Sequence, residues 1–127
     1  MNAWKAASRS VLVVGAALML SSAIDALAHA LLTKSEPARR AVLSKPPAQV
    51  RLWFNEKLEP AFCTVEVLAD DGKPVTRQPA HVAAQDPKLL ELALPALPPG
   101  NYTVQYRVLS VDGHTVRAAY RFSVQGR

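Results

Sequence analysis

The sequence predicts an all-β fold, a Greek-key β-sandwich or flattened β-barrel of about seven strands. Apolar and polar residues alternate with period two almost everywhere, which is typical of strands with one buried face. No window carries the apolar stripe of an amphipathic helix with capping residues. Ten prolines and five glycines divide the apolar runs into short segments. Many short strands in about a hundred residues favour two sheets packed face to face.

Each expected strand follows from its own alternation. In the first, Val50, Leu52 and Phe54 would face the core, while Arg51 and Trp53 would face outward. The strand-like segments are residues 50–54, 62–67, 90–94, 102–108 and 116–124. Between them, residues 70–73 (Asp-Asp-Gly-Lys) predict a hairpin turn, residues 98–101 (Pro-Pro-Gly-Asn) a turn, and residues 84–88 a loop.

The first 28 residues have the pattern of a secretory signal peptide. Lys5 and Arg9 precede an apolar run over residues 11–20, which is too short to span a membrane, and Ala26-Leu27-Ala28 is a suitable cleavage site. We therefore expect residues 1–28 to be removed on export to the periplasm and residues 29–127 to form the mature domain. Two alternatives remain at this point. The leader could be an uncleaved anchor, or Ala28-His29-Ala30 could direct a cut after Ala30 that removes His29.

Length and charge limit the functions that the sequence allows. Cleavage after Ala28 leaves 99 residues, enough for one domain, with thirteen basic and nine acidic residues. The basic residues are scattered, so we expect no nucleic-acid partner. The single cysteine, Cys63, excludes an intrachain disulfide, and its apolar surroundings predict a buried structural thiol.

His29, Asp112 and His114 are the candidate metal ligands. A histidine at a free N-terminus offers two nitrogens, its α-amine and Nδ1, which close a six-membered chelate ring. Asp112 and His114 are two residues apart, so an extended backbone would direct both to one face, and Gly113 would allow a bend. Three nitrogens and one carboxylate oxygen suit a tetragonal Cu(II) site.

Each of these residues also has a plainer interpretation. Asp112-Gly113 is a common hairpin dipeptide, and His29 could be a tolerated residue beside a cleavage site. The third histidine, His81, has no partner at ligand spacing and is interpreted as a surface or strand residue. No nucleophile elbow or phosphate-binding glycine loop is present, so we expect a binding protein and not an enzyme.

Beyond His29, the informative segments are residues 33–38, 50–56, 59–62, 71–75, 97–104, 108–114 and 120–124. Over essentially the whole mature chain, their order and spacing resemble the CopC-type periplasmic copper-binding proteins. This family resemblance implies an immunoglobulin-like or cupredoxin-like sandwich. It also implies one Cu(II) bound at the positions of His29, Asp112 and His114, with the Glu56 carboxylate supporting these ligands.

The resemblance implies copper buffering, sequestration or delivery in copper resistance, beside a CopD-type inner-membrane copper transporter. We expect a monomer. Some family members carry a Met-rich Cu(I) site, but Met1 and Met19 are the only methionines here and both lie in the leader, so we expect a Cu(II)-only protein. Two other functions remain as alternatives. One is a copper oxidase or oxygenase built on a histidine brace, and the other is a metal-free sandwich that mediates protein interactions.

Overall fold

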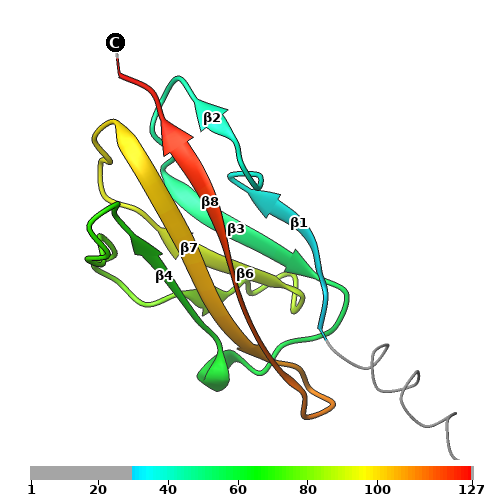
Figure 1. Ribbon diagram of the computed structural model, residues 1–127. Helices are drawn as coiled ribbons and strands as arrows, with labels where there is room; N and C mark the ends of the chain where they lie inside the picture. The colour runs from blue at the N-terminus through cyan, green and yellow to red at the C-terminus, as the bar shows by residue number, and fades with distance from the viewer. Residues whose placement is uncertain (1–29, 127) are drawn as a thin grey trace, which may run out of the picture.

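This computed structural model describes residues 30–126, and its strands form two sheets of four (Figure 1). The expected signal peptide and His29 lie outside the described residues. Within residues 30–126, no helix is long and apolar enough to cross a membrane. The predicted all-β sandwich is confirmed. The two sheets stay separate and do not close into a barrel.

The chain passes repeatedly between the two sheets, and only β5–β6 and β7–β8 follow each other within one sheet. The first sheet has the order β1-β3-β6-β5 and contains β1 (Leu32–Glu36), β3 (Gln49–Phe54), β5 (His81–Val82) and β6 (Leu89–Ala93). The second has the order β2-β8-β7-β4 and contains β2 (Val42–Leu43), β4 (Thr64–Leu68), β7 (Gly100–Leu109) and β8 (Thr115–Val124). All pairings are antiparallel except that of β2 with β8.

The core lies between the sheets and is made by the predicted inward rows. Phe54 of β3 meets Tyr106 of β7 edge to face, with ring centroids 5.6 Å apart, and Tyr102 stacks on Phe122 at 5.4 Å. These geometries are favourable for aromatic pairs. The buried inward residues of the long strands are Val50, Leu52, Phe54, Val65, Val67, Leu90, Leu92, Tyr102, Val104, Tyr106, Val108, Tyr120, Phe122 and Val124.

One predicted strand begins later than the sequence pattern suggests. Residues Pro60–Phe62 form a short 3-10 helix, η1, so Phe62 and Cys63 precede β4. Pro60 supplies the fixed φ that suits the start of such a turn. The predicted turn at residues 70–73 is confirmed, with Gly72 at a φ of +81° and its amide donating to Ala69. Residues 84–88 lie outside the strands, as predicted.

The Tyr102 hydroxyl ties the turn before β7 to the core, because it donates a hydrogen bond to the Pro98 carbonyl. We expect Tyr102→Phe to lower the free energy of unfolding by about 1 kcal/mol through loss of this bond. Denaturant unfolding measures the change. Tyr106→Phe is the matched control, because the Tyr106 hydroxyl has no hydrogen-bond partner among residues 30–126. Equal losses in the two variants would contradict the assignment.

Candidate metal centre

Residues 110–114 form the hairpin turn between β7 and β8. The Ser110 amide donates to the His114 carbonyl at 3.0 Å, and the Gly113 amide donates to the Ser110 carbonyl at 2.9 Å. Gly113 has a φ of +94°, in the left-handed region that glycine adopts most readily. The turn interpretation of Asp112-Gly113 is therefore right. The chain reverses direction here, so Asp112 and His114 lie on the bend that Gly113 was expected to allow and not on an extended backbone.

The turn itself brings the two described candidate ligands together. His114 Nδ1 lies 3.3 Å from Asp112 Oδ1, and the two side chains are 37% and 38% exposed. The imidazole and the carboxylate are therefore adjacent and open to solvent at the tip of the hairpin. The tight turn that Gly113 permits thus brings the two side chains together.

Ser110 holds the Asp112 carboxylate in place. Its side chain is completely buried, and its hydroxyl donates a hydrogen bond to Asp112 Oδ1. It also lies 3.2 Å from the His114 carbonyl oxygen. The Ser110 hydrogen bond is the main cause that lowers the pKa of Asp112 below its ordinary value, and His114 adds to the effect. The carboxylate is thus kept ionised, the form in which it binds a metal.

A chain of hydrogen bonds connects this turn to the start of the described chain. The Leu31 amide donates to Asn55 Oδ1 at 2.7 Å, and the Asn55 amide donates to the Leu31 carbonyl at 3.0 Å. Two residues further on, the Lys57 carbonyl accepts a hydrogen bond from the Val111 amide at 2.9 Å. In Figure 1 the beginning of β1, the end of β3 and the β7–β8 hairpin accordingly lie toward the same end of the sandwich.

Ala30 and Glu56 lie within this connection. Ala30 is 1% exposed, so the chain is packed against the core from its first described residue. Glu56 is half-buried and lies between Asn55, which binds Leu31, and Lys57, which binds Val111. The structure therefore places Glu56 in the segment that links the start of the chain to the hairpin turn.

Cys63 takes the structural role that the sequence predicted. Its side chain is 7% exposed, and its thiol donates to the Glu59 carbonyl at 3.2 Å. Burial raises the pKa of the Cys63 thiol, which disfavours the thiolate that a metal requires. Among residues 30–126, no three His, Cys, Asp or Glu side chains group closely enough to hold a metal ion. Asp112 and His114 need at least one further ligand.

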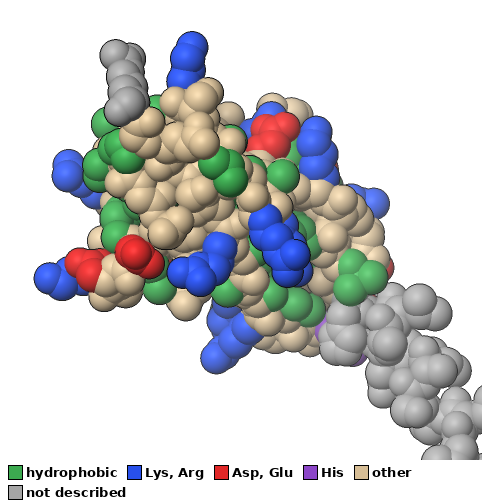
Figure 2. All heavy atoms as spheres, turned by 45° about the horizontal axis from the view of Figure 1, so that its top comes forward, with side chains coloured by type: hydrophobic (Ala, Val, Ile, Leu, Met, Phe, Trp, Pro, Cys, Tyr) green, Lys and Arg blue, Asp and Glu red, His purple; other side chains and the backbone are tan. Residues whose placement is uncertain are grey.

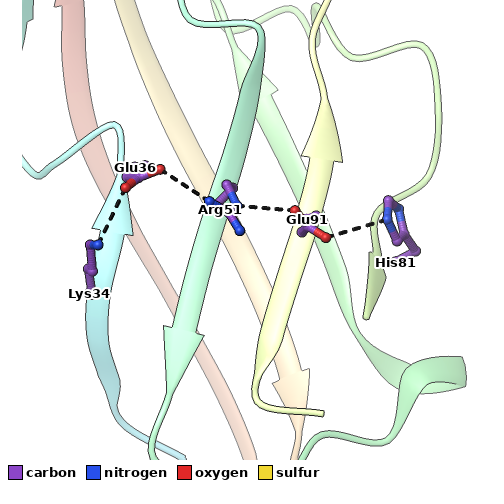
Figure 3. Close-up of polar contacts among 5 residues, drawn as sticks. All are labelled: Lys34, Glu36, Arg51, His81 and Glu91. Atoms are coloured by element: carbon purple, nitrogen blue, oxygen red, sulfur yellow. Dashed lines mark hydrogen bonds and ion pairs between the residues drawn. The ribbon is translucent and has the colours of Figure 1, made fainter. Parts of the chain in front are cut away.

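His81 lies in β5, away from the hairpin turn, as the strand interpretation predicted. Its Nε2 lies 3.9 Å from Glu91, which pairs with Arg51 at 3.1 Å. Arg51 also approaches Glu36 at 3.8 Å, so one line of polar contacts crosses all four strands of the first sheet (Figure 3). The contacts of His81 belong to this outer face and not to the candidate metal centre.

Sequence reasoning missed Ser110 and Asn55. A serine two residues before Asp112 is unremarkable in sequence, and its complete burial appears only when the strands pack. Asn55 directly follows the predicted strand over residues 50–54, where a polar residue reads as an ordinary strand end. A polar side chain at the junction of an apolar strand and a candidate ligand segment is the one signal available for both residues.

Ser110→Ala is expected to weaken Cu(II) binding by about tenfold, within the roughly 10–100-fold that loss of a ligand's supporting partner costs. The physical reason is that the Asp112 carboxylate loses the hydroxyl that orients it. A Cu(II) competition titration measures the change. Ser123→Ala is the matched control, since Ser123 lies at the far end of β8. Unchanged affinity in Ser110→Ala would remove Ser110 from the site.

Comparison with known proteins identifies the class to which this chain belongs. The model of the CopC domain family matches residues 32–125, so the chain belongs to the CopC family. It is 37% identical to Protein YobA of Escherichia coli K12 over 99 residues, which cover 77% of this chain and 80% of the relative. It is 33% identical to copper resistance protein C of Xanthomonas campestris pv. juglandis, with 98% of this chain and all of the relative covered.

Solved structures agree with this assignment. CopC from Methylosinus trichosporium OB3b superposes with a TM-score of 0.72 at 36% identity, covering 76% of this chain and 94% of that one. PcoC, a methionine-rich copper resistance protein from Escherichia coli, gives a TM-score of 0.69 at 27% identity, with 76% and 99% covered. The family resemblance found in the sequence is therefore confirmed, and so is a copper-related function.

Proposed function

We propose that the protein binds one Cu(II) ion per mature chain and buffers, sequesters or delivers copper in the periplasm. The observation that carries this proposal is the Asp112–His114 pair, held at the tip of a hairpin by a buried serine hydroxyl. An ionised carboxylate beside an imidazole is a ligand pair that suits Cu(II). Copper is here the cargo of the protein, and binding is the whole of its chemistry.

His29 would complete the ligand set after cleavage behind Ala28, with residues 1–28 acting as the signal peptide. Its α-amine and Nδ1 would add two nitrogens to the carboxylate oxygen of Asp112 and the imidazole nitrogen of His114. Support comes from its neighbours, because Ala30 is buried and Leu31 is hydrogen-bonded on both its polar backbone atoms to Asn55. The same segment of chain, through Lys57, contacts the residue before Asp112.

Glu56 would orient the ligands by hydrogen bonding without binding the metal itself. Its position supports this role, since it is half-buried between the residue that holds Leu31 and the residue that holds Val111. Partners that fix ligand orientation raise metal affinity by reducing the freedom that binding must remove.

The proposed oxidation state follows from the ligands available. Residues 29–127 contain no methionine, and Cys63 is buried with a raised thiol pKa, so soft ligands for Cu(I) are lacking. We further propose a monomer that passes copper to, or receives it from, a CopD-type inner-membrane protein. The leader pattern supports the periplasmic location.

A competition titration with Cu(II) and Cu(I) chelators tests this function on the chain that begins at His29. We expect one equivalent of Cu(II) to bind tightly and Cu(I) to be held more weakly. Cys63→Ser should leave both affinities unchanged, because the thiol plays no part in binding. Tighter retention of Cu(I), abolished by Cys63→Ser, would instead make Cys63 a ligand. Failure to bind either ion would favour a metal-free interaction module.

A further inference from the structure

The outer face of the second sheet carries two arginines directly opposite each other. Arg107 of β7 pairs in register with Arg117 of β8, and Thr64 of β4 extends the same row. Like charges at opposing positions of antiparallel strands repel each other. Nothing in the folding of the sheet requires this choice, because both side chains lie on the face that does not enter the core.

Neither arginine has a compensating partner among residues 30–126. The ion pairs of the described chain do not include them, whereas Arg121, four residues after Arg117 on the same face of β8, lies 3.8 Å from Asp70. Arg107 Nε is buried and has no hydrogen-bond partner in the described part of the molecule. Buried donors are nearly always satisfied, so this one calls for a ligand.

These arginines line a groove with a volume of about 940 Å³. The groove crosses β8, β7 and the edge strand β4, and the segment over residues 76–80 forms one wall. That wall adds a third arginine, Arg77, while Glu66 is the one acidic side chain in the lining. In the space-filling view, basic side chains project across the middle of the visible face and acidic ones lie nearer its margins (Figure 2).

We propose that this groove binds an acidic peptide segment of a partner protein. Arginine presents a fork of N–H donors that matches a carboxylate, and three such forks from separate segments suit successive Asp or Glu side chains. The volume of the groove falls within the range of about 300–1,000 Å³ that is typical of pockets for whole organic ligands. It is larger than one small anion would fill. Thr64 and Gln105 add neutral hydrogen-bonding groups along the same path. The site is independent of the copper ligands.

The test uses the purified protein and a fluorescein-labelled hexaglutamate peptide, with hexaglutamine as the neutral probe. Fluorescence anisotropy at low and at physiological salt measures binding. We expect hexaglutamate to bind and hexaglutamine not to bind. Arg117→Gln and Arg107→Gln should each weaken the affinity for hexaglutamate about tenfold, since each removes charge-assisted hydrogen bonds. Arg121→Gln is the matched control, with the same charge change on the same strand and face, and should stay within about twofold of the parent.

Thermal unfolding separates loss of binding from loss of fold. Because Arg117→Gln removes a like-charge pair, its Tm should be equal to that of the parent or higher. Equal weakening by Arg117→Gln and Arg121→Gln would show general charge attraction and overturn the proposal, as would absence of hexaglutamate binding.

Two further probes complete the test. Inorganic phosphate that binds as tightly as the peptide would replace the proposal with a small-anion site. Phosphatidylglycerol vesicles that bind through Arg117 when the peptide does not would replace it with a membrane surface.

Discussion

A chain that begins at His29 is expected to bind Cu(II) far more tightly than the same chain with one glycine added before it. In the extended chain the nitrogen of His29 belongs to a peptide amide, which is a poor ligand unless it is deprotonated. The chelate ring formed by the α-amine and Nδ1 is then lost. The effect should exceed the roughly 10–100-fold caused by losing a supporting partner, since two direct ligands are changed.

A Cu(II) competition titration on the two chains measures this difference, and equal Tm values without metal would show that the fold is intact. Equal affinity would mean that the free N-terminus is not a ligand. It would leave Asp112 and His114 as the remaining candidate ligands. Intact mass of the exported protein provides the matching observation in the cell, because it locates the cleavage after Ala28 or after Ala30.

Proton competition gives this site a characteristic pH dependence. The α-amine has an ordinary pKa of about 7.7–8.0 and imidazole one of about 6.5, so both nitrogens bind protons as the pH falls. Metal binding must displace those protons, and Cu(II) affinity should therefore decrease from pH 8 to pH 5. Asp112 contributes little to this decrease, because Ser110 lowers the pKa of its carboxyl and keeps it ionised. The added glycine should reduce the dependence near pH 8, where the α-amine titrates.

The second large effect is expected from His114→Ala, which removes an imidazole nitrogen from the proposed ligand set. Cu(II) affinity should fall by more than the roughly 10–100-fold cost of losing a supporting residue. Asp112→Ala should also weaken binding, but less, because Cu(II) favours imidazole nitrogen over a single carboxylate oxygen. Competition titration measures both variants, and electron paramagnetic resonance of the Cu(II) complex reports the change in nitrogen ligation.

His81→Ala is the matched control for His114→Ala. It removes the same chemical group from β5, where His81 contacts Glu91 on the outer face of the first sheet. Its Cu(II) affinity should equal that of the parent. If the double variant of Asp112 and His114 bound copper as tightly as the parent, the assignment of the hairpin as the metal centre would be wrong.

The alternation of apolar and polar residues within each strand predicts most of the fold. Alternation over residues 50–54, 102–108 and 116–124 correctly predicted which side chains enter the core, because a period of two specifies the buried face of a strand. The start of β4 was placed too early, since Phe62 and Cys63 share the apolar character of the strand that follows. Apolar character alone does not distinguish a strand from a short helical turn before it.

What the sequence by itself determined was the inward rows, the turns, the family and the close spacing of Asp112 and His114. Tertiary structure alone decided that Ser110 is buried beneath Asp112 and that Asn55 holds Leu31. It also decided that Arg107 lies opposite Arg117. The burial of Ser110 and the bond between Asn55 and Leu31 depend on segments that are distant in sequence, and the position of Arg107 opposite Arg117 depends on strand register. Local periodicity carries no information about which strands become neighbours. Pairing of strands within each sheet brings Asn55 to Leu31 and Arg107 to Arg117, and the surrounding folded chain buries Ser110.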